Sequence, residues 1–312
     1  MRPATRLNIM SSRPIVVQTT TFNENSGGSI VLHYLVHSLR KMGIEAYVSP
    51  NVKERSNYYP RWTKLIHDKF LYHRFKKKLN LLDLMDTPIA SKDIIADSIV
   101  VYPEIVKGNP LNAKRVVRWL LNKPGFFNRA PYVHNVNEEI FFYQYAFAQG
   151  IKEISSDNLL QIRWLRHDIY KNKNLTNRQG SCRMIRKGKR SKQIAIPERD
   201  ESILIDGMSH VEIAKIFNKS KIFYCHDLYT MYCYYAVLCG CVPVVIPQDN
   251  LTKEQWRDGF EMKNGVAYGE DEIDWAIKTR EQLILDMQNS KNTEKIQIEA
   301  FLTKVQSRTN WG

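Results

Sequence analysis

The sequence predicts an α/β protein with two doubly wound units in tandem. Its 312 residues are long for one hydrophobic core and suit two domains of about 150 residues each. A strand, a polar loop, a helix and a second strand follow one another over residues 14–48, and the same pattern returns over residues 222–247. Such βαβ units build parallel sheets that helices cover on both faces.

The first unit opens with a β-branched run at residues 14–20, which predicts a strand. A polar loop follows at 21–29, and then a helix whose apolar residues recur at helical spacing over 30–39. Gly43 ends this helix, and residues 45–48 form the second strand. This is the usual opening of a doubly wound domain.

The rest of the first unit is less regular. Residues 49–92 are aromatic and basic and are expected to be an insertion that contains helices. Residues 98–102 resume the strand pattern, and 112–122 (NAKRVVRWLLN) predict a helix that ends before Pro124 and Gly125. A further strand is expected near residues 131–134.

The second unit is expected to start near residues 160–180, which are polar and rich in turn formers. Its predicted strands are residues 182–185, 202–205, 222–225 and 242–246. Ser209 is placed to cap one helix, and a second helix over residues 231–239 should stop at Gly240. Residues 271–305 are helical in pattern.

The composition is that of a globular protein. Hydrophobic residues make up 43% of the chain, and no segment approaches the roughly 20 apolar residues that span a bilayer. The N-terminus lacks the apolar core of a signal peptide, so a cytoplasmic location is expected. The five cysteines are odd in number and lie mostly in apolar runs, so neither disulfides nor a zinc site is expected.

The formal charge of +14 favours anionic partners such as nucleotides, lipid phosphates or nucleic acid. Residues 62–78 resemble a basic amphipathic helix around Phe75, which would rest on the inner face of an anionic membrane. A solvated helix face would have the same composition. Nucleic acid is not an expected partner, because no nucleic-acid-binding module is recognisable.

In the first unit, polar residues follow predicted strands, at the edge where such sheets bind ligands. Gly27 and Gly28 lie in the loop before the first helix, where paired glycines let a phosphate or an acceptor approach the backbone, although a plain glycine-rich turn would look alike. Glu24 and Glu104 are loop carboxylates that could serve as a base. His134 could contact a bound ligand, or is a structural histidine.

Two further carboxylates, Glu138 and Glu139, follow the same expected strand as His134. In the second unit, Arg183, Arg186 and Lys187 come after the first strand, where their cations could clamp a diphosphate. A solvent-exposed basic loop would have the same residues.

Four segments together resemble nucleotide-sugar glycosyltransferases of the GT-B type. They are the N-terminal glycine loop, Arg186-Lys187-Gly188, the helix from Glu212 to Phe217, and the stretch from Asp227 through AVLCGCVPVV at residues 236–245. The resemblance implies two Rossmann-like domains facing across a cleft, with a C-terminal helix that returns to the N-terminal domain. It implies an acceptor-side domain over residues 1–165 with the insertion at 49–92, a nucleotide-sugar domain over 166–285, and the returning helix over 286–312.

The resemblance also implies site residues. Those for the donor nucleotide and diphosphate are Arg183, Arg186, Lys187, Asp227, Tyr229, Thr230 and Tyr235. Asp227 matches the first carboxylate of the family's E-x7-E segment, and Tyr235 stands where the second would hold the ribose. Gly27 and Gly28 would shape the cleft, with His134 and Glu24 as candidate catalytic groups. Cationic side chains would replace a metal, and no cofactor is expected.

The function expected from this resemblance is transfer of a sugar from a UDP, GDP or dTDP donor to a glycan or lipid-linked acceptor. The segment from Arg118 to Gly125 also resembles surface-polysaccharide glycosyltransferases of bacteria and large viruses, so that pathway is the expected setting. Two alternatives remain open: a nucleotide-sugar epimerase of the same fold, and a non-catalytic basic protein that binds nucleotide or nucleic acid.

Overall fold

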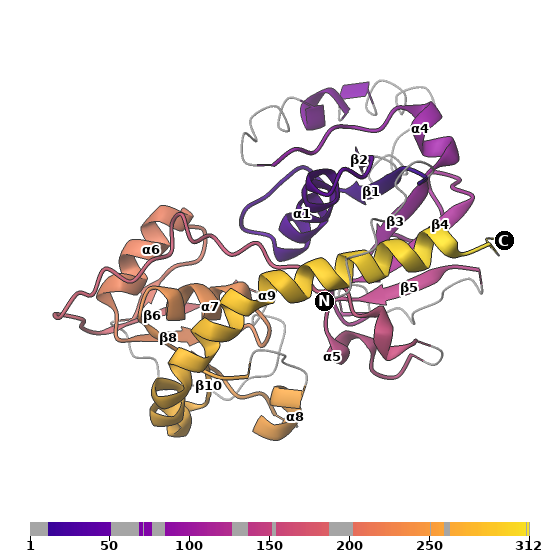
Figure 1. Ribbon diagram of the computed structural model, residues 1–312. Coiled ribbons are helices and arrows are strands. Elements are labelled where there is room, and N and C mark those ends of the chain that lie inside the picture. Colours follow the sequence, from indigo (N-terminus) through magenta and orange to yellow (C-terminus); the bar gives the residue numbers. More distant parts are fainter. Residues whose placement is uncertain are drawn as a thin grey trace, which may run out of the picture. The chain divides into compact units, whose positions relative to one another are not determined.

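The computed structural model of the chain shows two compact units (Figure 1). It describes residues 12–50, 69–70, 72–76, 85–126, 137–151, 154–186, 202–249, 251–258, 263–309 and 311. The first unit consists of Met1–Trp164 with Glu294–Gly312, and the second of Leu165–Thr293. Each unit has its own parallel sheet and its own hydrophobic core. The predicted α/β class with two units is therefore confirmed.

The first unit contains a five-stranded parallel sheet in the order β2-β1-β3-β4-β5. Its strands are β1 (Ile15–Thr19), β2 (Ala46–Pro50), β3 (Ile99–Pro103), β4 (Arg115–Leu120) and β5 (Glu139–Phe142). Helix α1 (Gly27–Lys41) connects β1 to β2, and the short helix α4 (Lys92–Asp97) precedes β3. The first predicted βαβ unit is thus present, with slightly shifted strand ends.

Alternate residues of β1 face two different cores. Val17 packs in one cluster with Leu35 of α1 and with Phe301 of the long C-terminal helix α9 (Ile273–Ser307). Val16 belongs to a smaller cluster on the opposite face, together with Ala90. Burial on both faces explains why the strands of this sheet read as continuous apolar runs instead of alternating ones.

Residues 112–122, predicted as a helix, instead contain the strand β4. Their apolar residues recur at a spacing that suits a helix as well as a strand. In the structure Val116, Val117 and Trp119 are all buried. Strand β4 also pairs with β3 on one side and with β5 on the other. Tertiary pairing therefore decides a segment whose local sequence is ambiguous.

The second unit contains a five-stranded parallel sheet in the order β10-β9-β8-β6-β7. Its strands are β6 (Ser181–Met184), β7 (Ile203–Leu204), β8 (Ile222–Cys225), β9 (Val242–Val245) and β10 (Ala267–Tyr268). Its helices before α9 are α6 (His210–Lys219), α7 (Met231–Leu238) and α8 (Lys253–Asp258). Numbered along the chain within each unit, both sheets have the order 2-1-3-4-5, which is that of flavodoxin-like folds.

The β8-α7-β9 unit confirms the predicted strand, helix, glycine stop and second strand. Gly240 has φ 84°, and α7 ends in a Schellman motif in which the amide of Cys241 donates to Ala236 O at 2.9 Å. A methyl group on Gly240 would lie 2.7 Å from Nη2 of Arg178. Both the backbone conformation and the lack of space therefore require glycine at this position.

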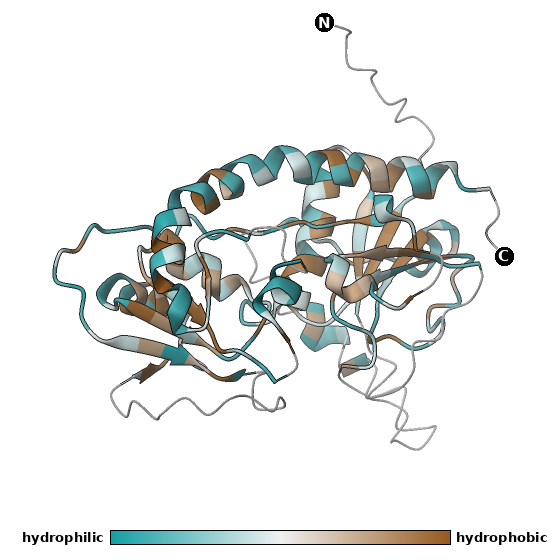
Figure 2. Cartoon of the chain, turned by 90° about the horizontal axis from the view of Figure 1, so that it is seen from below, coloured by the Kyte–Doolittle hydropathy of each residue, from teal (hydrophilic) through white to brown (hydrophobic). Residues whose placement is uncertain are grey.

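Helix α9 carries hydrophilic and hydrophobic residues in alternation along its length (Figure 2). Among the described helices, none combines the length and the apolar composition that a membrane crossing needs, and this includes the 35 residues of α9. The five cysteines are buried and free: Cys182, Cys225, Cys233, Cys239 and Cys241.

Candidate functional site

The second unit gathers polar residues in the last part of β6 and after β7 and β8. Arg183 lies within β6 and not after it, contrary to expectation, because the strand extends to Met184. Strands β6 and β8 are neighbours in the sheet, although β7 lies between them in the sequence. A reversal of strand order of this kind is where open parallel sheets bind ligands. We call this region, formed by Arg183, Arg186, Asp206, His226 and Thr230, the β6–β8 edge.

A turn after β6 holds Arg186 in an uncommon backbone conformation. Its φ is 25°, in the left-handed region that residues other than glycine seldom adopt. The carboxylate of Asp206, just after β7, accepts hydrogen bonds from the backbone N–H of Ile185 at 3.2 Å and of Arg186 at 2.9 Å. Backbone strain of this kind costs about 1–3 kcal/mol and persists only where the surroundings impose it. Asp206 thus fixes the place of Arg186.

Buried aromatic rings support the side chain of Arg186. Its Cζ lies 5.4 Å from the ring centroid of Tyr232, and Tyr232 stacks on His210 with centroids 5.7 Å apart. The hydroxyl of Tyr170 in turn forms a hydrogen bond with Nδ1 of His210 at 2.5 Å. Burial raises the pKa of Tyr170, so its phenol stays protonated. Arg186 therefore lies against a rigid aromatic stack.

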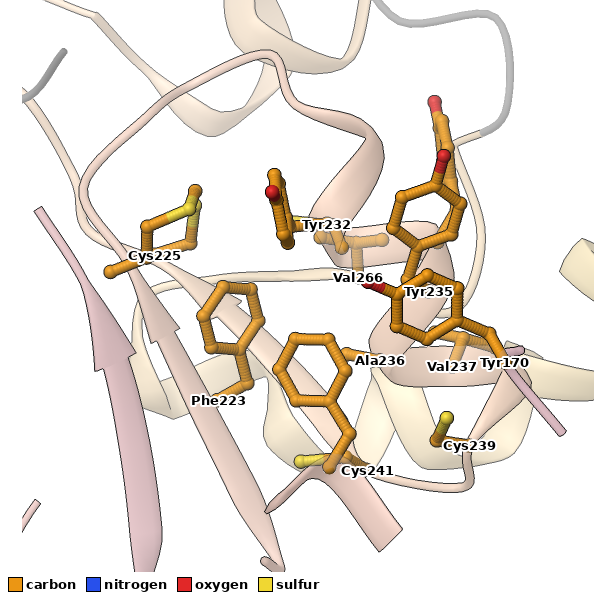
Figure 3. Packing of buried hydrophobic residues seen from close by; sticks show 14 of the residues in the cluster. Tyr170, Phe223, Cys225, Tyr232, Tyr235, Ala236, Val237, Cys239, Cys241 and Val266 are labelled. Atoms are coloured by element: carbon orange, nitrogen blue, oxygen red, sulfur yellow. The ribbon is translucent and has the colours of Figure 1, made fainter. Parts of the chain in front are cut away.

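Tyr235 belongs to the same aromatic core and not to the β6–β8 edge (Figure 3). Its side chain is 1% exposed, and its ring lies parallel to that of Tyr170 with centroids 4.1 Å apart. Figure 3 shows it beside Ala236 and Val237 of the same helix. A ring enclosed in this way offers no surface to a ribose, so its placement does not support the ligand contact expected for Tyr235.

Arg183 and His226 lie close enough to interact electrostatically. Burial lowers the pKa of His226, the charge of Arg183 lowers it further, and Asp206 opposes both effects. The imidazole is therefore neutral near pH 7. Nε of Arg183 is buried and has no hydrogen-bond partner within the described part of the chain. A buried donor without an acceptor is costly, so this atom is suited to an additional acceptor such as a ligand oxygen.

The loop from β8 to α7 is fixed at both ends. The indole Nε1 of Trp256 on α8 donates to Leu228 O at 3.0 Å. The hydroxyl of Thr230 caps α7 by accepting from an amide of its first turn at 3.4 Å. Tyr229 lies between these anchors and Asp227 precedes them, and both are half-buried. Burial raises the pKa of Tyr229 to about 12. The loop is therefore held in a conformation in which its backbone could contact a ligand.

The chemistry of the β6–β8 edge suits an anion. Arg183 and Arg186 contribute two guanidinium groups, whose donors match phosphate oxygens. The carboxylate of Asp206 already accepts two backbone amides, and the neutral ring of His226 adds no charge. The amides at the start of α7 add partial positive charge.

The first unit holds the loop between β1 and α1 in a set conformation. Nε2 of His33 donates to Thr20 O at 3.0 Å, because a carbonyl can only accept. Burial lowers the pKa of His33 to about 4, so the ring is neutral near pH 7. Ser29 Oγ donates to Thr21 O at 3.2 Å and accepts from the amide of Asn23 at 3.0 Å. The loop therefore reaches the start of α1 preorganised.

Gly27 and Gly28 form the first positions of α1, after the capping residue Ser26. A Cβ on Gly27 would meet no atom within 4 Å, and one on Gly28 would meet only the side chain of Leu121 at 3.9 Å. Neither glycine has a positive φ. Neither packing nor backbone conformation requires these glycines, and their lack of side chains leaves the backbone at the start of α1 open to a ligand.

The end of β1 leaves two buried polar atoms without partners in the described residues. They are Oε1 of Gln18 and Oγ1 of Thr19, whose residues are 1% and 2% exposed. Strand β1 pairs with β3 on one side and β2 on the other, so this is the strand-order reversal of the first sheet. Buried unpartnered polar atoms at such a position suit a bound ligand or water.

Three carboxylates of the first unit have structural partners. Glu104 accepts from a backbone amide after β4 at 3.0 Å. Glu138 forms a bidentate pair with Arg118, whose shorter distance is 2.7 Å, and both side chains are 5% exposed. Glu139 begins β5 and lies 3.1 Å from Nζ of Lys304. Glu138 thus precedes β5 and Glu139 begins it, while the strand expected near residues 131–134 lies outside the described residues.

The remaining predicted site residues fall into two groups. Glu24 is half-buried in the loop before α1, near the two glycines in sequence. His134 and Lys187 lie outside the described residues. Sequence reasoning missed Asp206 and His226 as site residues, although each directly follows a predicted strand, which is the signal that would have found them.

Within the described ranges, no three histidine, cysteine, aspartate or glutamate side chains are grouped so that they could hold a metal ion. Comparison of the sequence with models of protein families and with curated proteins gives no match. Function is therefore inferred from the residues at the carboxyl ends of the two sheets.

Proposed function

We propose that this protein is a glycosyltransferase of the GT-B type, which moves a sugar from a nucleoside-diphosphate donor to a glycan or lipid-linked acceptor. The observation that carries the proposal is the β6–β8 edge. There a backbone-strained Arg186, an incompletely partnered Arg183 and the start of α7 converge on the strand-order reversal of the sheet. A diphosphate oxygen would supply the acceptor that the buried Nε of Arg183 lacks within the described residues.

The reaction itself explains why a fixed cation is useful. The bond between the anomeric carbon and the diphosphate oxygen breaks, and the acceptor oxygen forms the new bond and loses its proton. Negative charge then grows on the departing diphosphate. A cation that is already in place stabilises this charge without reorganisation during the reaction. Asp206 and the Tyr232 ring hold Arg186 in this manner.

The first unit would serve the acceptor side. Its sheet has the same strand order as the second, and its own reversal carries Gly27, Gly28 and the buried unpartnered Thr19 hydroxyl. Glu24, half-buried in the loop before α1, is the candidate base of that edge.

A thermal-shift screen with UDP, GDP, dTDP and CMP tests the donor site, because a ligand that binds the native state raises its melting temperature. We expect one nucleotide to stabilise the protein. Arg183→Gln and Arg186→Gln should each lower the affinity for that nucleotide about tenfold or more, since a hydrogen bond to a charged group contributes about 1.5–3 kcal/mol. Lys219→Gln, an exposed cation at the end of α6, is the control and should bind as the wild type does.

Transfer is then measured with the matching nucleotide sugar and a panel of glycan and lipid-linked acceptors. Release of nucleoside diphosphate that depends on the acceptor supports a transferase, whereas isomerised sugar without acceptor indicates an epimerase. Unchanged nucleotide affinity in both arginine variants would overturn the assignment of the β6–β8 edge. Tight RNA binding with no nucleotide binding would favour the basic binding protein instead.

A further inference from the structure

One surface of the first unit combines exposed aromatic rings with unpaired cations. Residues 69–70 and 72–76 are helical. Phe70 is 60% exposed and Tyr72 is 44% exposed, which are high values for large apolar side chains. Lys69, Arg74 and Lys76 lie beside them and are exposed as well. We call these five residues the 69–76 surface.

A buried anchor holds this surface on the first unit. Phe75 is 3% exposed and belongs to the same hydrophobic cluster as Val17 and Leu35. Its ring stacks on His33 of α1 with centroids 6.5 Å apart. Because neighbours on a helix point about 100° apart, Arg74 and Lys76 project to opposite flanks of the anchored turn. The exposed side chains are therefore displayed on a fixed base.

The cations of this surface have no internal role. Within the described part of the chain, Lys69, Arg74 and Lys76 form no ion pair and no hydrogen bond. The sequence contains no aspartate or glutamate from residue 69 to residue 82, and Asp68 and Asp83 flank this stretch. The whole chain carries a formal net charge of +14, so it is attracted to an extended anionic surface.

We propose that the 69–76 surface docks this protein onto anionic lipid bilayers. Exposed rings such as that of Phe70 gain by entering the headgroup region, while lysine and arginine on both flanks reach lipid phosphates. Single-stranded nucleic acid would also stack its bases on exposed rings between cations, so RNA is compared with vesicles in the test below. This proposal does not depend on the glycosyltransferase assignment.

Vesicle co-sedimentation of the full chain tests the proposal, with phosphatidylcholine alone and with phosphatidylcholine mixed with phosphatidylglycerol. We expect binding only to the anionic vesicles, and less at high salt. The triple variant Lys69→Gln, Arg74→Gln, Lys76→Gln should lose about tenfold or more in affinity. The variant Phe70→Ser, Tyr72→Ser should lose the part of the binding that persists at high salt.

The control variant is Lys215→Gln, Lys219→Gln, Lys278→Gln, which removes three exposed charges from the second unit. It should retain clearly more binding to anionic vesicles than the triple variant of Lys69, Arg74 and Lys76. All substituted positions are exposed, and circular dichroism confirms that each variant is folded. Equal loss in both triple variants would show that only net charge matters and would overturn the proposal. The proposal would also be overturned if the wild type failed to sediment with anionic vesicles. The same holds if the triple variant of Lys69, Arg74 and Lys76 lost binding to RNA but not to vesicles.

Discussion

Gly28 and Gly240 lack a side chain for different physical reasons. Gly240 has φ 84° and no room for a methyl group, because Arg178 and Asn172 would lie 2.7 Å and 2.9 Å from it. Gly28 has an ordinary helical backbone, and the one atom near its missing Cβ is 3.9 Å away. Gly240 is therefore required by the fold, whereas Gly28 leaves the backbone at the start of α1 open.

Substitution at these two positions should separate stability from activity. We expect Gly28→Ala to leave stability unchanged or to raise it by about 0.5 kcal/mol, since alanine restricts the unfolded chain. Under the proposed function it should lower transfer about tenfold or more, because a methyl group displaces the ligand from its productive position. Urea unfolding and the transfer assay measure the two effects.

Gly240→Ala is the contrasting variant. Its left-handed conformation alone should cost about 1–2 kcal/mol, and the close contacts add to this value. If Gly28→Ala were the more destabilising of the two, the open surface inferred at the start of α1 would be wrong.

At the scale of elements, one side chain joins the ends of two helices. Arg178 donates from Nη1 to Phe217 O of α6 at 2.8 Å and from Nη2 to Cys239 O after α7 at 2.5 Å. Both carbonyls belong to the last turns of helices, where acceptors lack partners and the dipole favours a cation. This contact links the two helices that cover one face of the second sheet.

Arg178→Met should therefore loosen the second unit. The loss of these charge-assisted hydrogen bonds is expected to lower the free energy of unfolding by about 2–3 kcal/mol, as measured by urea denaturation. Arg178→Lys keeps the charge but not the planar guanidinium group. Its free energy of unfolding should therefore lie between those of Arg178→Met and the wild type. Equal stability of all three proteins would mean that the helix ends are satisfied by water instead.

For the whole molecule, α9 matters because it contributes to both units. Its residues up to Thr293 belong to the second unit, and those from Glu294 belong to the first. In the first unit Phe301 is fully buried against Phe141 of β5, with ring centroids 5.0 Å apart. Glu294 is also buried and accepts from the amide of Arg163 at 3.2 Å. The first core is thus incomplete without the C-terminus of the chain.

Phe301→Ala should destabilise the protein by about 3–5 kcal/mol, because it opens a cavity in a closed core. Ile296→Ala removes an apolar side chain from the same helix that is 64% exposed, so it should change stability by less than about 0.5 kcal/mol. Urea denaturation of both variants provides the comparison. Similar effects at the two positions would contradict the packing of α9 on the first sheet.

The sequence by itself determined the fold class and the βαβ unit of residues 222–247, because capping residues, a glycine stop and β-branched runs are local signals. It also located Arg186 at a strand end. Only the tertiary structure decided that residues 115–120 are a strand, since pairing on both sides overrides an ambiguous pattern. Likewise, the contact of Asp206 with Arg186 and the burial of Tyr235 against Tyr170 join residues distant in sequence, which spacing along the chain cannot reveal.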